Sequence, residues 1–231
     1  MGAYLGDGRT AGEADKKVRF NVADPDFANL LNESVAQVLG TQPKATRIEH
    51  GFHSVVYDSA VLYDFLQQPI EQLIPYAESS PEAFLRGFFD AEGYVSANLD
   101  FAAERFRGIT IGIANSNEAY LSCIERLLAT LGMRTSRRRT HVAGEPMTIR
   151  GRTFFRKHDV WHLLIRGRGA AMLFSSSINF SIPAKRTKLQ DLIWVSMNLE
   201  PTEGYKWFLG HYERRGRRWF KKQASRNTQS S

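Results

Sequence analysis

Apolar and polar residues alternate with a period of two in two stretches of the chain, "VRFNV" from Val18 and "ITIGI" from Ile109. This period predicts strands with one buried face. A helical pattern follows each stretch after Asp24 and Asn115, whose short polar side chains are typical of helix N-caps. Both helical patterns end at a Leu-Gly pair, and glycine readily adopts the left-handed conformation found just beyond a helix. These matching segments indicate an internal repeat.

The repeat extends over most of the chain. Each copy continues with basic residues and then with an apolar stretch rich in β-forming residues, and helices are expected to begin at Pro81 and Pro183. The order helix, two strands, helix, two strands, helix occurs twice, which predicts an α+β fold with antiparallel sheets. We place the two repeats at residues 1–83 and 84–200. Residues 201–231 form a basic, aromatic extension whose last residues are expected to be disordered.

A second pattern lies in the helices that open the two copies. The stretch "RGFFDAEG" has small residues at Gly87 and Ala91, four positions apart, followed directly by Glu92. The N-terminal "MGAYLGDG" repeats this arrangement, with Asp7 in the place of Glu92. Residues four apart share one face of a helix, so two such helices can pack almost backbone to backbone. This packing is expected to bring Asp7 and Glu92 together.

Two neighbouring carboxylates at helix C-termini indicate a bound cation. They repel each other, and the end of a helix itself carries partial negative charge. Divalent metal ions relieve this repulsion, and oxygen ligands of this kind suit Mg²⁺. The alternative is a packing motif with two exposed acids. The presence of the motif in both copies favours a reactive, metal-binding site over a packing motif.

The charge distribution favours a polyanionic partner. Residues 1–93 hold 7 Lys and Arg against 14 Asp and Glu, a net charge of −7, whereas residues 94–231 hold 24 against 10, a net charge of +14. A basic region of this size most often binds nucleic acid, although it can simply be a solvated surface. Combined with the paired carboxylates, it indicates metal-assisted hydrolysis of phosphodiester bonds.

Several protein classes are excluded by the composition. No run of about 18 apolar residues is present, so no membrane span is expected. The N-terminus lacks the basic start and apolar run of a secretory signal. The single cysteine, Cys123, cannot form an internal disulfide and is expected to be buried. We therefore expect a cytoplasmic, nucleoid-associated protein.

The stretch "LRGFFDAEG" from Leu85 resembles the LAGLIDADG motif of homing endonucleases. The N-terminal "GAYLGDG" resembles the shortened first motif of the two-motif, monomeric, archaeal intron-encoded members. The resemblance extends to about residue 198, where "INFSIPAKRTKLQDLI" is similar to the closing stretch of the family. It implies two pseudo-symmetric αββαββα halves, whose antiparallel sheets form saddles over the DNA major groove around a central interface of the two motif helices.

The resemblance also implies an activity and a metal site. A monomer of this family cuts both strands of double-stranded DNA across the minor groove, leaves short 3′ overhangs and requires no protein partner. Carried onto this sequence, Asp7 and Glu92 would bind the metal ions, with help from the backbone carbonyls of Gly6 and Ala91. Two or more Mg²⁺ ions are expected, and Mn²⁺ or Ca²⁺ can substitute in binding.

Four further residues are assigned to the site by the resemblance. Asp24 and Asn115 fall where the family orders metal-bound or attacking water. Lys185 resembles the active-site lysine, which steadies the charge that builds on the phosphate. Lys188 is its competitor, and a surface lysine at the start of a helix is the alternative. The first copy has Ala83 in the place of Lys185, so the two half-sites are expected to be unequal.

DNA contacts are expected from strand residues that point away from the core, and from the basic extension. Arg105 and Arg107 share the parity of buried Ile109, so a turn or bulge must intervene if they face DNA. Trp207 and Trp219 are expected to anchor the extension by packing. The expected DNA-contacting residues are Lys17, Arg19, Asn21, Ser96, Asn98, Arg105, Arg107, Arg137, Arg139, Arg150, Arg152, Lys188, Arg214 and Arg217.

Two other functions fit the same fold. One is an RNA maturase that assists intron splicing, and the other is a DNA-binding regulator that does not cut. The presence of both Asp7 and Glu92 argues against the regulator but not against the maturase. The acidic first half indicates that its acids lie on the outer surface, or that the second half dominates DNA binding.

Overall fold

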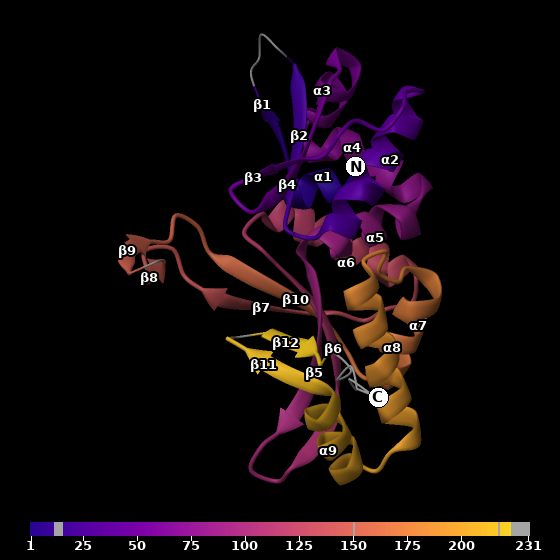
Figure 1. Ribbon diagram of the computed structural model, residues 1–231, viewed down its shortest axis with the longest axis vertical. Helices are drawn as coiled ribbons and strands as arrows, with labels where there is room; N and C mark the ends of the chain where they lie inside the picture. Colours follow the sequence, from indigo (N-terminus) through magenta and orange to yellow (C-terminus); the bar gives the residue numbers. More distant parts are fainter. Residues whose placement is uncertain (12–15, 150, 217, 223–231) are drawn as a thin grey trace, which may run out of the picture.

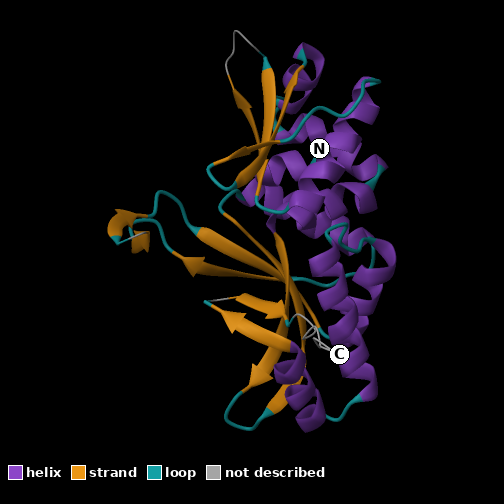
Figure 2. Cartoon of the chain, viewed as in Figure 1, coloured by secondary structure: helices purple, strands orange, loops and turns teal. Residues whose placement is uncertain are grey.

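The computed structural model describes residues 1–11, 16–149, 151–216 and 218–222 (Figure 1). The C-terminal residues 223–231, where disorder was predicted, lie outside this range. The molecule is built from two halves, and in both of them the helices gather on one side and the strands on the other (Figure 2). No helix in the described ranges is long and apolar enough to cross a membrane.

The two halves share one strand order, which confirms the predicted pseudo-symmetric fold. Each four-stranded sheet is antiparallel and has the order first, second, fourth, third. The elements of the first half are α1 (Gly2–Asp7), β1 (Gly8–Ala11), β2 (Lys17–Val22), α2 (Pro25–Leu39), β3 (Arg47–Glu49), β4 (Phe52–Asp58), α3 (Ala60–Leu66) and α4 (Ile70–Ser79). Those of the second half are α5 (Pro81–Glu92), β5 (Gly93–Asp100), β6 (Arg105–Asn115), α6 (Glu118–Thr130), β7 (Ser136–His141), β10 (Val160–Arg166) and α7 (Arg168–Ser177).

Additional elements are inserted into the second half and follow it. The two-stranded sheet of β8 (Pro146–Ile149) and β9 (Arg152–Phe155) projects beyond β7 and β10 (Figure 1). After α7 come α8 (Pro183–Asn198), α9 (Pro201–His211) and the hairpin of β11 (Tyr212–Arg215) and β12 (Arg218–Lys221). Helices begin at Pro81 and Pro183 as predicted, and the one at Pro81 is the motif helix of the second half.

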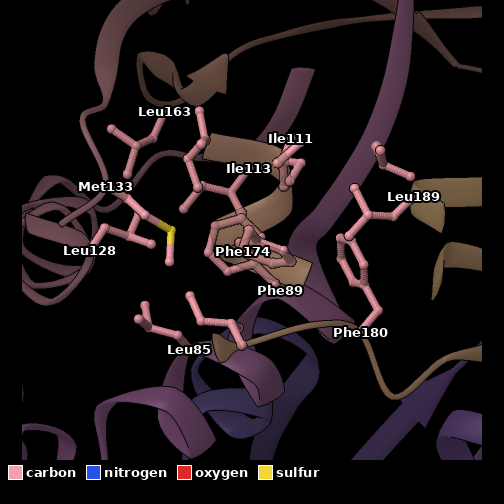
Figure 3. Close-up of a cluster of buried hydrophobic side chains, with 14 of the residues drawn as sticks. Leu85, Phe89, Ile111, Ile113, Leu128, Met133, Leu163, Phe174, Phe180 and Leu189 are labelled. Carbon is pink, nitrogen blue, oxygen red and sulfur yellow. The ribbon is translucent and has the colours of Figure 1, made fainter. Parts of the chain in front are cut away.

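The predicted alternation gives each sheet one buried face. Val18, Phe20 and Val22 on β2 are buried in the core of the first half. In the second half the core is larger and includes Phe89 of α5, which lies near Ile111, Ile113 and Phe174 (Figure 3). Cys123 is buried in the same core, as predicted. The motif helix α5 thus has its apolar side anchored in the larger core.

One of the two predicted helix caps is confirmed and the other is wrong. The Asp24 carboxylate accepts a hydrogen bond from the Phe27 amide at 3.0 Å and caps α2. The cap of α6 is Asn117, whose side chain accepts from the Tyr120 amide at 3.1 Å. Asn115 cannot be the cap because its backbone is still paired with Trp161 in the sheet. Its side chain instead accepts from the Asn117 amide at 2.8 Å.

The predicted irregularity near Arg105 and Arg107 is a β-bulge. Asn98 pairs with Gly108, but the next residue of β5 pairs with Phe106, so Arg107 is the extra residue. Gly108 has a φ of +138°, a conformation that favours glycine. The bulge keeps Phe106 in the core while both arginines are exposed.

Candidate active site and nucleic-acid interface

The motif helices α1 and α5 pack against each other through their small residues, as the sequence predicts. A Cβ atom added to Gly2 would overlap the Phe84 carbonyl oxygen, and one added to Gly6 would lie 2.5 Å from the Ala91 Cβ. A Cβ on Gly87 would lie 3.0 Å from a backbone nitrogen of α1. Larger side chains at these positions would force the two helices apart.

Both motif helices end in the same way, with the acid as their last residue. Asp7 ends α1 and Glu92 ends α5, and the next residue of each is a glycine in extended conformation that already belongs to a strand. The amide of Gly8 donates to the Tyr4 carbonyl, and that of Gly93 donates to the Phe89 carbonyl. A Cβ atom on either glycine would overlap the preceding helical turn. The two acids therefore occupy equivalent positions at one end of the helix pair.

The Glu92 side chain lies against the end of α1, because a Cβ atom on Gly6 would lie 3.0 Å from its Cγ and 3.7 Å from a carboxylate oxygen. Burial raises the pKa of Asp7 above its usual value, although the Lys185 charge opposes the shift. Burial also raises the pKa of Glu92, the neighbouring charge of Asp7 raises it further, and the result is about 7. A group of positive charge placed between them would stabilise both ionised forms.

Lys185, at the start of α8, lies beneath this acid pair. Its ammonium donates to the carbonyl oxygens of Phe89 at 3.1 Å and of Asp90 at 2.6 Å, in the last turn of α5. Burial lowers the pKa of Lys185 to about 8, against the opposing charges of Asp90, Asp7, Asp24 and Glu92. Acids from both halves therefore favour the charged form of one half-buried ammonium.

Asp90 ties the segment before α8 to the same helix. Its carboxylate is buried and accepts hydrogen bonds from the Ser181 amide at 3.0 Å and the Ile182 amide at 3.4 Å. Arg86, one turn earlier, donates to the Ile178 carbonyl at 2.6 Å. We call these contacts, together with those of Lys185, the α5 clasp. It fixes the end of α5 that carries Glu92.

Asp24 and Asn115, the two residues predicted to order water, have different surroundings in the structure. Asp24 caps α2, and its charge helps to raise the pKa of Lys185 against the effect of burial. Asn115 lies at the end of β6 and has its side chain engaged in the turn before α6.

The residues around the acid pair fit a divalent metal of the Mg²⁺ type. Within the described ranges, no group of three His, Cys, Asp or Glu residues is placed to hold a metal ion. Mg²⁺ commonly uses only one or two protein carboxylates and takes its remaining ligands from water and substrate phosphates. Gly6 and Ala91 lie in the last turns of α1 and α5, where carbonyl oxygens have no partner within the helix.

The open face of the first sheet carries the predicted polar residues. Lys17, Arg19 and Asn21 alternate along β2 with the buried apolar residues. Arg9 of β1 pairs directly with Arg19 and lies on the same face. The Arg19 guanidinium lies 3.6 Å from the Glu49 carboxylate, an exposed ion pair that contributes little stability and can exchange for a phosphate.

Many acids of the first half lie on the helices, away from this face. This placement agrees with the expected outer surface for these helical acids (Figure 2), whereas Glu49 of β3 and Asp58 of β4 lie on strands and pair with basic residues. The helical acids are Asp26 and Glu33 of α2, Asp64 of α3, Glu71 and Glu78 of α4, and Glu82 of α5.

The open face of the second sheet forms a shallow polar hollow. Ser96 and Asn98 line it as predicted from the alternation, and the Asn98 amide donates to the Thr110 hydroxyl at 3.0 Å. Arg138 of β7 and Arg166 of β10 supply its positive charge. Sequence reasoning missed both arginines. The alternation in "HLLIR" could have indicated Arg166, because it shares the parity of His162 and not of buried Leu163.

Two predicted DNA contacts point elsewhere in the structure. Arg137 pairs with Leu163 on the core side of β7, and its guanidinium lies 2.6 Å from Glu125 of α6. The Lys188 ammonium lies under the C-terminal hairpin and donates to the Trp219 carbonyl at 3.2 Å. Burial lowers the pKa of Lys188 to about 8. Neither residue belongs to the open strand face.

The remaining predicted contacts are exposed basic residues. Arg107 pairs with Asp100 at 2.7 Å, and Arg139 pairs with Asp159 at 3.0 Å. Arg105, Arg152 and Arg214 are exposed. Arg150 and Arg217 lie outside the described residues.

The extension is anchored by aromatic packing, as predicted. Trp219 packs edge-on against Phe208, with ring centroids 5.2 Å apart. Trp207 stacks on His211 at 4.0 Å and lies beside Trp194. The hairpin of β11 and β12 is therefore held in place by α8 and α9.

Comparisons with known proteins identify relatives of this chain. The LAGLIDADG-like domain family matches residues 79–179. The uncharacterized protein MJ0398 of Methanocaldococcus jannaschii is 31% identical over 200 residues, which cover 84% of this chain and 69% of that protein.

Solved structures share the fold at low sequence identity. I-DmoI in complex with DNA and Ca superposes with a TM-score of 0.55 and 19% identity, over 82% of this chain and 93% of that one. The meganuclease I-SmaMI, bound to uncleavable DNA, superposes with a TM-score of 0.54 and 12% identity, over 90% of this chain and 94% of that one. Another I-DmoI complex holds DNA and Mn.

Proposed function

This chain belongs to the LAGLIDADG family, and from that membership we propose that it is a site-specific, metal-dependent endonuclease that cuts both strands of double-stranded DNA. The single observation that carries the proposal is the pair Asp7 and Glu92, which end two closely packed helices at equivalent positions. A merely structural helix pair has no need of two partly buried acids whose charges oppose each other.

Asp7 and Glu92 would hold the metal ions, with the carbonyls of Gly6 and Ala91 nearby. When bound, Mg²⁺ supplies charge for the scissile phosphate and lowers the pKa of a coordinated water. The carboxylates must be ionised for this role, and burial raises the pKa of both, that of Glu92 to about 7. Structures of I-DmoI with Ca and with Mn are consistent with a divalent site in this fold.

Lys185 acts in this proposal chiefly by holding the acid pair. Its ammonium donates to two carbonyl oxygens in the last turn of α5, which puts positive charge near the end of the helix that carries Glu92. Asp24, whose charge helps to raise the pKa of the same lysine, is available to order water there.

DNA would lie across the open strand faces of both sheets. Lys17, Arg19 and Asn21 supply polar contacts from the first half, and Ser96 and Asn98 supply them from the second. A monomer with two unequal halves is proposed, because the α5 clasp has no equivalent on α1, where Leu5 stands in the place of Asp90.

The experiment that tests this function is cleavage of a randomised duplex library with Mg²⁺, followed by sequencing of the ends. A defined site with short 3′ overhangs is the expected product. Glu92→Gln should abolish cleavage and leave DNA binding intact. Normal cleavage by this variant would refute the assigned chemistry, and stimulation of intron splicing without DNA cleavage would favour the RNA maturase.

A further inference from the structure

The inserted hairpin, residues 146–155 of β8 and β9, enters the site described above only through the predicted contacts Arg150 and Arg152. All four residues of β9 are exposed. The exposed fraction of Phe155 is 69%, and that of Phe154 is 47%. An isolated two-stranded hairpin is marginally stable in water, and exposed aromatic side chains add nothing to that stability. The aromatic pair therefore requires an explanation other than folding.

The base of the inserted hairpin is held firmly, so it projects as a fixed arm and not as a loose loop. The Gly144 amide donates to the Arg156 carbonyl at 2.9 Å, and the Arg156 amide donates to the Glu145 carbonyl at 3.0 Å. The Ala143 amide donates to the Asp159 carboxylate at 2.8 Å, and Arg139 pairs with the same acid. Figure 1 shows the arm extending past β7 and β10 on the strand side, away from the helices.

The aromatic residues lie on opposite faces of the arm. Successive strand residues alternate in direction, so Phe154 faces the same way as its partner Met147, while Phe155 faces the same way as Pro146. Neither face thus offers a broad apolar patch of the kind that a protein partner would cover. Such a narrow ribbon, apolar on both faces, fits a partner that surrounds it.

The charges around the arm are positive. Arg152 and Lys157 are exposed, and neither is paired with an acid in the described part of the chain. The one acid between residues 142 and 158 is Glu145, which already lies 4.0 Å from Arg156 and 3.3 Å from His141. Unpaired basic residues beside aromatic ones favour nucleic acid over an acidic or neutral protein surface.

We propose that the inserted hairpin is an additional DNA-reading arm that enters the major groove outside the tract covered by the two sheets. The major groove admits a two-stranded ribbon, and apolar side chains there contact thymine methyl groups. Phe155, with Phe154 behind it, supplies the apolar contact with base edges, and Arg152 and Lys157 contact phosphates. This inference deepens the proposed function by extending its recognition site, and it rests on the DNA partner alone, not on cleavage.

The test uses the full chain carrying Glu92→Gln, which prevents cutting, and a randomised duplex library in Ca²⁺. Replacing Phe154 and Phe155 by Ala should remove base preference at one end of the selected site and lower affinity about fivefold, since one good base contact contributes about 1 kcal/mol or more. Phe155→Trp should retain the preference. Tyr76→Ala is the matched control, because Tyr76 is 56% exposed on α4 at the helical side.

A salt titration separates the two kinds of contact. Replacing Arg152 and Lys157 by Ala should reduce the slope of log affinity against log salt by about 2, whereas the phenylalanine variant should leave it unchanged. Arg126→Ala on α6, which pairs with Glu78 on the helical side, is the control. An unchanged selected site in the phenylalanine variant would overturn the proposal. Self-association that disappears in that variant would also overturn it.

The outcome is independent of the nuclease assay. A shorter selected DNA site in the variant with Phe154 and Phe155 replaced by Ala supports the arm, even if the unaltered chain never cuts DNA. In that case only the proposed function fails. Absence of any DNA binding by the unaltered chain overturns the arm.

Discussion

Removing the charge of Glu92 should make the metal-free protein more stable while it abolishes cleavage. The pKa of Glu92 is raised from its ordinary value of 4.5 to about 7, first by burial and then by the charge of Asp7. A shift of this size corresponds to about 3 kcal/mol of unfavourable free energy when the group is ionised. Glu92 is partly exposed, and solvent screening reduces the figure to about 1–2 kcal/mol.

The sign follows from the direction of the shift. A carboxyl whose pKa is raised by folding contributes stability at pH values below 4.5 and loses it as pH rises through 7. Glu92→Gln keeps the shape but cannot ionise, so at pH 8 it should melt about 3–6 °C above the unaltered chain. The difference should shrink below pH 7 and be lost toward pH 4.5.

Thermal unfolding without metal, between pH 4.5 and 8, measures this effect. Glu33→Gln is the control, because it removes the charge of an exposed carboxylate on α2 that is not part of the acid pair. Mg²⁺ should raise the melting temperature of the unaltered chain at pH 8 and leave the Glu92→Gln variant unchanged. Equal or lower stability of Glu92→Gln at pH 8 would refute the conclusion that the two carboxylates repel each other.

Three further predictions follow from the same region. Gly2→Ala should destabilise the protein by about 1–3 kcal/mol in urea unfolding, since its Cβ would overlap a carbonyl of α5, whereas Gly210→Ala, with open space around it, should be neutral or stabilising; equal effects would argue against close helix packing. Ca²⁺ affinity measured by calorimetry should fall up to tenfold per pH unit below 7, because Glu92 must first lose its proton; a flat profile would exclude Glu92 as a ligand. Asp90→Asn should cost about 1–3 kcal/mol, because asparagine supplies only one acceptor oxygen and its NH2 group would face the Ser181 amide from which Asp90 Oδ2 now accepts at 3.1 Å; an unchanged urea midpoint would show that the Asp90 carboxylate contributes no stability.

The repeat, both sheets and the helix pair could be predicted from sequence because each rests on local periodicity. Alternation along β2 placed its polar residues on one face correctly, and the conflict in parity at Arg107 correctly indicated a bulge. The small residues four apart predicted the contact of α1 with α5.

The errors arose where pairing between strands decides the outcome. Asn115 and Asn117 are both good cap residues, and only the continued pairing of Asn115 with β10 rules it out. Three consecutive arginines alternate in direction, and the pairing of Arg137 with buried Leu163 puts Arg137 and Arg139 on one face and Arg138 on the open face. The position of Lys188 depends on a hairpin more than 20 residues later in the chain, which no local pattern reveals.

The sequence predicted neither the α5 clasp nor the arm, and the same reason applies to both. The clasp depends on contacts between residues about 90 positions apart. The arm was apparent only as a group of arginines, because exposure of Phe154 and Phe155 on both faces is a property of the folded hairpin.

The direct passage of each motif helix into its strand couples the position of its terminal acid to the position of that strand. Glu92 and Tyr94 are two residues apart, and no loop separates the acid from the first position that faces the groove. A duplex whose contour tilts β5 must tilt the carboxylate with it, and the same holds for Asp7 and β1. Under the proposed function, a poorly matched target would therefore be rejected at the hydrolytic step even when the chain stays bound to it.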